Sequence, residues 1–159
     1  MHDDAVRWND RYQSAAPVFP LAPEPLGDRP DLAALVPESG FAVDIACGLG
    51  SQTLWLAARG LHVTALDVST VALERLDDAA RAAGLQERVD ALVADLDTGL
   101  PDHLGTADVV VCQRFRNPAI YSSIAELLAP DGIAIVTVLS AVGTNGKPGS
   151  FHAPAGELS

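Results

Sequence analysis

The residues with the clearest chemical potential are two aspartates and two glycines near the ends of short apolar runs. Asp44 lies late in the run FAVDIA, Gly48 and Gly50 fall in the turn that follows, and Asp67 comes directly after the run LHVTAL. Glycine lets the backbone approach a ligand closely, and carboxylates accept hydrogen bonds from the adjacent hydroxyls of a ribose. The pattern therefore predicts a nucleotide-like ligand at the ends of two strands.

The chemistry of this turn disfavours a dinucleotide. A G-x-G-x-x-G fingerprint would require a third glycine where the chain has Thr53. The charge of Asp44 would also face a pyrophosphate unfavourably at close range. S-adenosylmethionine (SAM) carries an ammonium, a sulfonium and an adenosine but no phosphate, so it fits better. An NAD(P)-type Rossmann oxidoreductase remains the less favoured alternative.

The elements that must hold these residues alternate regularly from Phe41 onward. Apolar runs typical of buried strands occupy residues 41–46, 61–66, 88–94, 107–112 and 133–139. Strands that are apolar on both faces and are separated by helices predict a parallel sheet covered on both sides. We therefore expect an α/β, Rossmann-like, doubly wound and mostly parallel sheet.

Helical spacing fills three of the four intervals between these runs. The first helix should end at Gly60, and the second should begin after Ser69 as its N-cap. The third helix, which precedes the fifth strand, should be stopped by Pro130 and Gly132.

Residues 1–40 differ in composition from residues 41–159. Val6, Trp8 and Tyr12 stand among polar residues in a short amphipathic helix. The passage APVFPLAPEPLGDRP then excludes regular structure, because each proline removes a donor and restricts its predecessor. We expect an N-terminal helix and Pro-rich lid segment over 1–40, one or two helical turns at its end, and a ligand-binding domain over 41–159.

The composition excludes several kinds of partner. A formal charge of −11, from 21 acidic and 10 basic residues, argues against nucleic acid, since nucleic-acid binders need a basic face. The longest apolar run, 132–139, is far shorter than the ~20 residues that span a bilayer, and the acidic N-terminus lacks the apolar core of a signal peptide. Cys47 and Cys112 fit no metal-ligand spacing and read as free thiols. We expect a cytoplasmic protein without a metal.

Five segments in the same order resemble the class I SAM-dependent methyltransferases. VDIACGLGSQTLWLAARG is similar to motif I, an acid-x-Gly-x-Gly-x-Gly pattern with Ala46 at the first glycine. VTALDVS resembles the segment whose acid, here Asp67, takes the ribose hydroxyls. ALVADLDTGLP resembles the stretch whose acid and next residue, here Asp95 and Leu96, flank the adenine. DVVVCQRF resembles motif IV, and LLAPDGIAIV resembles the turn into strand five, so the match covers residues 40–140.

This resemblance implies SAM as the cofactor and a set of contacts to it. A narrower similarity, to small enzymes of the tellurite-resistance and thiopurine methyltransferase type, rests on WNDRY, QRFRNPAIYSSIAELLAPDG and FHAPAGEL. In those enzymes the N-terminal helix covers the cofactor, so Trp8, Arg11 and Tyr12 are expected near its methionine end. The expected cofactor-binding residues are Asp44, Ala46, Cys47, Gly48, Gly50, Asp67, Val68, Asp95, Leu96, Gln113, Trp8 and Arg11.

The reaction implied is methyl transfer to a small-molecule acceptor, with a SAM-binding protein that lacks transferase activity as the alternative. The sulfonium is an activated leaving group, so alignment matters more than a dedicated catalytic residue, and we assign none. Arg114 and Arg116 follow the fourth strand, where substrate and methyl group should meet. His152 stands near the expected substrate mouth. His62 is expected in a strand and His103 in a loop, and we give neither a role.

The last expectation concerns the sheet edge. The resembling family has seven strands, but SAVGTNGKPGSFHAPAGELS, the segment after Leu139, reads as loop. We therefore expect the strand order 3-2-1-4-5, with strands six and seven missing because the chain is incomplete. An apolar fifth strand at the edge favours pairing with another chain, so a monomer and a homodimer both remain open.

Overall fold

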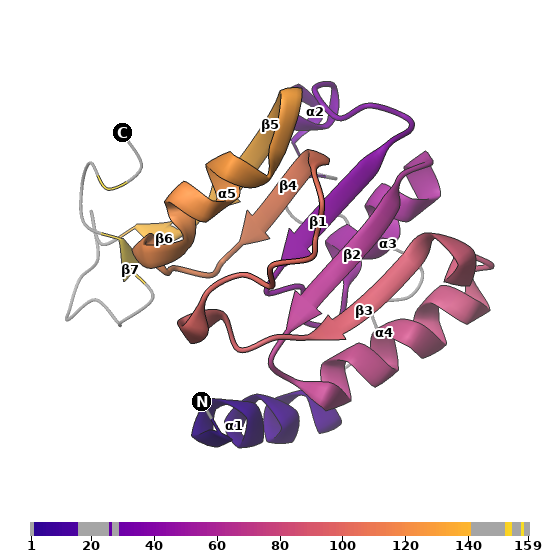
Figure 1. The fold of residues 1–159 in the computed structure, drawn as a ribbon. Coiled ribbons are helices and arrows are strands. Elements are labelled where there is room, and N and C mark those ends of the chain that lie inside the picture. The colour runs from indigo at the N-terminus through magenta and orange to yellow at the C-terminus, as the bar shows by residue number, and fades with distance from the viewer. Residues whose placement is uncertain (1, 16–25, 27–28, 141–151, 154–156, 158–159) are drawn as a thin grey trace.

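A computed structural model describes residues 2–15, 26, 29–140, 152–153 and 157 (Figure 1). Its main strands are β1 (Phe41–Ile45), β2 (His62–Asp67), β3 (Val89–Val93), β4 (Ala107–Gln113) and β5 (Leu128–Thr137). Its helices are α1 (His2–Gln13), α2 (Pro30–Ala33), α3 (Ser51–Arg59), α4 (Thr70–Ala82) and α5 (Tyr121–Leu127). Short 3-10 turns are η1 (Gln86–Arg88), η2 (Leu96–Thr98) and η3 (Pro118–Ile120).

The five main strands form one sheet in the order β3-β2-β1-β4-β5, and every pair is parallel. This confirms the expected fold and strand order. The chain reverses its direction of progress across the sheet between β1 and β4, and ligands in such sheets bind at the carboxyl ends of the strands beside that point. The fold therefore directs attention to the residues that follow β1, β2 and β4.

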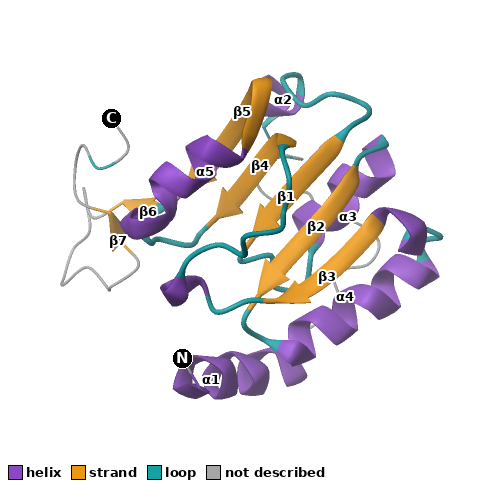
Figure 2. Ribbon diagram, in the orientation of Figure 1, coloured by secondary structure: helices purple, strands orange, loops and turns teal. Residues whose placement is uncertain are grey.

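Helices cover both faces of the sheet (Figure 2). The core on one face contains Leu54 of α3 and Leu76 of α4, and the core on the other contains Ile120 of η3 and Ile124 of α5. Successive residues of β1 and β4 alternate between the two cores. Burial on both faces explains why these strands read as continuous apolar runs.

The boundary between α5 and β5 differs from the sequence expectation. The helix ends at Leu127, before Pro130, and the strand already begins at Leu128. Proline favours an extended conformation in the residue before it, so the chain leaves the helix ahead of Pro130 instead of at it. The β4–β5 register then shifts, because Ala107 pairs with Leu128 but Val109 pairs with Ile133.

The other helix ends behave as expected. Ala72 N donates to Ser69 Oγ over 3.1 Å, which makes Ser69 the N-cap of α4. Gly60 ends α3 with a φ of 123°. Among the described residues no helix is long and apolar enough to cross a membrane.

The loop expected after Leu139 falls mostly outside the described residues. Within them, β6 (Leu139–Ser140) and β7 (His152–Ala153) form a separate parallel pair. These two short strands do not extend the main sheet. The described part of the sheet therefore ends at β5, in the order expected from the sequence.

Candidate functional site

A cavity of about 640 Å³ lies at the carboxyl ends of β1, β2 and β4, within the size range of small-molecule sites. All twelve residues expected to bind a cofactor line it, and so do Tyr12, Arg114 and Arg116. Sequence reasoning missed the other lining residues, Asp4, Arg7, Leu49, Ser51, Gln52, Asp97 and Phe115. Asp4 and Arg7 share a helical face with Trp8 and Arg11, so the period of α1 was the signal that could have found them.

The turn after β1 uses left-handed backbone conformations. Ala46, Gly48 and Gly50 have φ angles of 55°, 57° and 84°. A Cβ at Gly48 would lie 2.8 Å from the Tyr12 hydroxyl, and one at Gly50 would lie 2.3 Å from Leu76 Cδ1. Both φ angles favour glycine, and an added Cβ at either position would have to displace the end of the neighbouring side chain, whereas Ala46 bears strain of about 1–2 kcal/mol. Such strain is typical of functional turns.

Asp67 is held rigidly at the end of β2. Its Oδ2 accepts from Gly48 N over 2.9 Å, and its Oδ1 accepts from Ser69 N over 2.8 Å. The residue is 6% exposed. Burial raises the pKa of Asp67, while the backbone hydrogen bonds oppose that shift. Each carboxylate oxygen keeps a further lone pair, so Asp67 can accept hydrogen bonds from a ligand in the cavity.

Asp44 is buried deeper, with 2% exposure. Thr53 Oγ1 donates to Asp44 Oδ2 over 2.7 Å, which explains a threonine where a dinucleotide fingerprint has glycine. Burial raises the pKa of Asp44 from 3.8 to about 7, although the Thr53 hydrogen bond acts in the opposite direction. Burial at this site therefore opposes ionisation of the Asp44 carboxyl group.

The variant Asp44→Asn tests this burial. Because the pKa of Asp44 is about 7 in the folded chain and its ordinary value is 3.8, the folded chain binds more protons than the unfolded chain between these pH values. The stability from Asp44 is therefore present below pH 3.8 and lost as the pH rises through about 7. Asparagine imitates the protonated carboxyl group. The melting temperature of Asp44→Asn should therefore exceed that of the parent at pH 8 and approach it at pH 5. Equal differences at both pH values would contradict this.

The thiol of Cys47 does not have the character of a nucleophile. Burial, followed by the charges of Asp44 and Asp67, raises the pKa of Cys47 well above its usual value. Burial also raises the pKa of Cys112 to about 12. Both cysteines are free thiols, and protonated thiols are poor nucleophiles. Neither thiol is therefore a candidate nucleophile.

Helix α1 lies against the start of α4 and brings aromatic residues to the cavity (Figure 1). Asn9 Oδ1 accepts from Ser69 Oγ over 2.6 Å and from Val71 N over 3.2 Å. Tyr12 stacks on Trp8 with ring centroids 5.7 Å apart. Burial, followed by the charge of Asp67, raises the pKa of Tyr12 to about 12. Asn9 was missed because nothing local in the sequence shows its distant partners.

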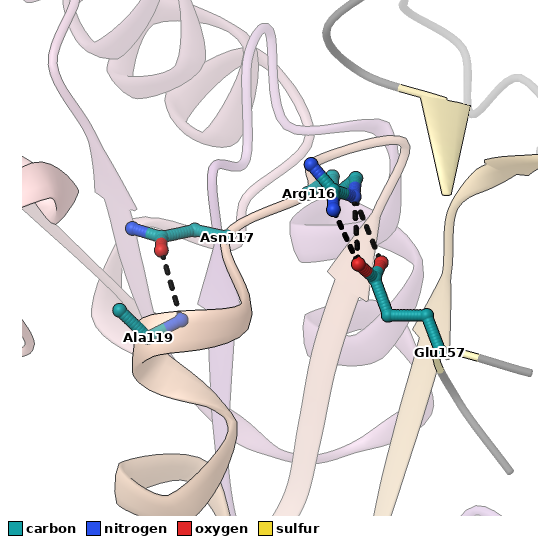
Figure 3. Close-up of polar contacts among 4 residues, drawn as sticks. All are labelled: Arg116, Asn117, Ala119 and Glu157. Carbon is teal, nitrogen blue, oxygen red and sulfur yellow. Dashed lines mark hydrogen bonds and ion pairs between the residues drawn. The ribbon is translucent and has the colours of Figure 1, made fainter. Parts of the chain in front are cut away.

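The residues after β4 form the opposite wall. Thr137 Oγ1 donates to Gln113 Oε1 over 2.6 Å, which ties Gln113 to β5. Arg114 has a φ of 57°, so the chain turns sharply here. Arg116 forms an ion pair with Glu157, and Asn117 Oδ1 accepts from Ala119 N (Figure 3). This wall therefore carries two arginines at the end of β4, as the sequence predicted.

The two histidines with described side chains, His62 and His103, do not line the cavity. His62 stands on β2 against Phe41, with ring centroids 5.8 Å apart, and His103 lines a separate hollow. The side chain of His152 lies outside the described residues. No group of three or more His, Cys, Asp or Glu side chains suited to a metal occurs in the part of the chain that the structure describes.

Comparisons with known proteins agree with this geometry. The family model described as "Methyltransferase domain" matches residues 42–132. The ubiquinone biosynthesis O-methyltransferase of Marinobacter nauticus is 28% identical over an alignment of 157 positions that covers 92% of this chain and 61% of that protein. An uncharacterized RNA methyltransferase of Parasynechococcus marenigrum is 30% identical over 102 residues, 64% of this chain and 22% of that protein.

A solved structure has the same fold. The "DhpI-SAM-HEP complex" superposes with a TM-score of 0.62 at 21% identity and covers 89% of this chain and 67% of that chain. The chain spans 61% and 22% of the two curated relatives above. The narrower similarity to the tellurite-resistance and thiopurine methyltransferase type stays a prediction. The family match and the fold together show that this chain belongs to the methyltransferase-domain family, with the Rossmann-like fold of the class I SAM-dependent methyltransferases.

Proposed function

We propose that this chain binds SAM in the cavity and transfers its methyl group to a small-molecule acceptor. The observation that carries the proposal is the carboxylate of Asp67, fixed by Gly48 N and Ser69 N at the cavity wall. A carboxylate with both oxygens oriented and lone pairs remaining suits the two adjacent hydroxyls of a ribose. Asp95 and Leu96 follow β3 at the same cavity, and we assign them to the adenine.

The methionine end of SAM should lie toward β1 and α1. Asp44 favours a cationic group, because a nearby positive charge stabilises the ionised carboxylate. Gln52 lines the cavity, and its Oε1 is buried without a hydrogen-bond partner among the described residues. A buried acceptor of this kind suits an ammonium donor. Trp8 and Arg11 of α1 line the same region and are the proposed cover of this end.

Bound SAM supplies an activated methyl group, and the residues of this chain would align the acceptor and exclude water. We assign no general base, because one is needed only when the acceptor must first lose a proton.

A small molecule is the acceptor favoured by charge. The formal charge of −11 opposes a polyanion, although one relative is named as an RNA methyltransferase. The free thiols Cys47 and Cys112 agree with the proposed cytoplasmic location.

Calorimetry with S-adenosylhomocysteine and NAD tests cofactor choice. We expect S-adenosylhomocysteine to bind and NAD not to bind. A chain that binds NAD and ignores S-adenosylhomocysteine would end the proposal. An acceptor screen that follows S-adenosylhomocysteine release then tests transfer, and binding without release over a broad screen would favour a SAM-binding protein.

We also propose that α1 is a lid over the cofactor. The hydrogen bonds between α1 and the start of α4 are few: Asn9 accepts from Ser69 and Val71, and Arg75 of α4 donates to the backbone oxygen of Tyr12. S-adenosylhomocysteine should therefore slow amide exchange at residues 5–15, while α5 serves as an internal control. Asn9→Ala should weaken S-adenosylhomocysteine binding by about 1–2 kcal/mol, because α1 loses two hydrogen bonds to α4. Unchanged exchange at residues 5–15 on binding would refute the lid.

A further inference from the structure

The charges that line the cavity are unevenly distributed. Carboxylates follow the strands on the cofactor side, with Asp44 in β1, Asp67 at the end of β2 and Asp95 after β3. Arg7 and Arg11 of α1 also line the cavity, whereas the wall after β4 carries Arg114 and Arg116 without a cavity-lining carboxylate of its own. In a chain with 10 basic and 21 acidic residues, two arginines at the acceptor wall are a local excess of positive charge.

Arg116 is already engaged with a carboxylate. Its Nε donates to Glu157 Oε1 over 3.0 Å and to Oε2 over 2.8 Å, and its Nη2 also donates to Oε1 (Figure 3). The side chains of Arg116 and Glu157 are 26% and 11% exposed. The two residues are 41 positions apart in the chain. A planar guanidinium that engages both oxygens of a carboxylate is the arrangement that recognises carboxylate ligands.

Tyr121 adds a second polar group beside this pair. Its hydroxyl oxygen is buried with no partner at hydrogen-bond distance among the described residues, although the Glu157 carboxylate is close enough to interact with it. Tyr121 lies behind the cavity wall and does not line the cavity itself. Burial, followed by the negative charge of Glu157, raises the pKa of Tyr121, so the phenol keeps its proton and can donate. A buried donor without a partner carries an unsatisfied hydrogen bond, which a carboxylate ligand of Arg116 could accept.

We propose that Arg116 and Tyr121 form a carboxylate-binding subsite, and that the methyl acceptor is a small molecule with a carboxylate whose place Glu157 takes in this structure. The inference rests on the proposed function and deepens it, because it names the chemical class of the acceptor. The carboxylate anchors the acceptor, and the methyl group goes to another atom. A phosphate could use the same donors, but the observed occupant of the guanidinium is a carboxylate.

Calorimetry on protein saturated with S-adenosylhomocysteine tests the subsite. The probes are benzoate and octanoate, their uncharged amides benzamide and octanamide, and phenyl phosphate. We expect each carboxylate to bind at least about tenfold more tightly than its amide. Arg116→Gln should remove that preference while S-adenosylhomocysteine affinity stays unchanged. Glu157→Gln should strengthen carboxylate binding severalfold, because the competing side chain loses its charge.

Arg29→Gln is the matched control, because Arg29 also pairs with a carboxylate, Asp31, but is exposed and does not line the cavity. Arg29→Gln should change neither the carboxylate preference nor the affinity for S-adenosylhomocysteine. Carboxylate preference retained in Arg116→Gln, or absent from both the parent and Glu157→Gln, would overturn the inference. Tighter binding of phenyl phosphate would reassign the subsite to phosphate and also overturn it.

The failure of each proposal is distinguishable. A parent protein that binds S-adenosylhomocysteine but shows no carboxylate preference, with none in Glu157→Gln either, refutes the subsite and leaves the proposed methyltransferase function standing. Failure of the parent to bind S-adenosylhomocysteine refutes the function itself. Should Arg116→Gln not fold, as judged by circular dichroism, the opposite prediction for Glu157→Gln decides the question.

Discussion

Asp67→Ala is expected to weaken S-adenosylhomocysteine binding by about 1–3 kcal/mol, roughly 5- to 150-fold in the dissociation constant. The variant loses the charge-assisted hydrogen bonds to the ribose hydroxyls. Titration calorimetry measures the change directly. Asp77→Ala is the control, because it removes the same charge from an exposed position on α4 and should leave the affinity unchanged. Parent-like affinity in Asp67→Ala would show that Asp67 is not the ribose ligand.

The same substitution should also lower stability, which the sequence alone did not suggest. From sequence we would expect little effect on folding, since Asp67 reads only as a ligand at a strand end. The structure shows that it accepts hydrogen bonds from Gly48 N and Ser69 N. Leaving such buried donors unpaired costs about 1–3 kcal/mol each. Binding should therefore be measured at low temperature, after circular dichroism has verified the fold.

Gly60→Ala is expected to lower the free energy of unfolding by about 2–5 kcal/mol, through backbone strain and overlap of about 1–3 kcal/mol each, less a small gain from the unfolded chain. Gly60 has a φ of 123°, which L residues rarely adopt, and its Cβ would lie 2.1 Å from the backbone oxygen of Glu38. For a domain of this size that loss lowers the melting temperature by roughly 5–15 °C. Thermal unfolding followed by circular dichroism measures it.

Gly84→Ala separates overlap from strain. Gly84 also follows a helix, with a φ of 71°, but a Cβ there would meet nothing within 4 Å. It should lose only about 1–2 kcal/mol, the cost of the left-handed conformation. Equal losses at both glycines would show that the contact with Glu38 contributes nothing.

The sequence by itself determined the order of the elements and the location of the cavity. Strands that are buried on both faces leave continuous apolar runs, and helices leave a 3.6-residue period, so both can be recognised locally. Parallel strands bring their carboxyl ends to one edge, which is why twelve residues expected to bind the cofactor all line one cavity. The predicted end of α5 was less accurate than the other predicted helix ends, because Pro130 restricts the residue before it as well as its own position.

Tertiary structure alone decided which distant side chains meet. Thr53 donates to Asp44, Asn9 accepts from Ser69, and Arg116 pairs with Glu157 across 41 positions. No local period encodes such pairs, because each depends on how separate elements pack. The pKa of Asp44, about 7, likewise follows from burial and not from its neighbours in sequence. The sequence therefore predicted residues that line one cavity, whereas packing determined their hydrogen bonds and the pKa of Asp44.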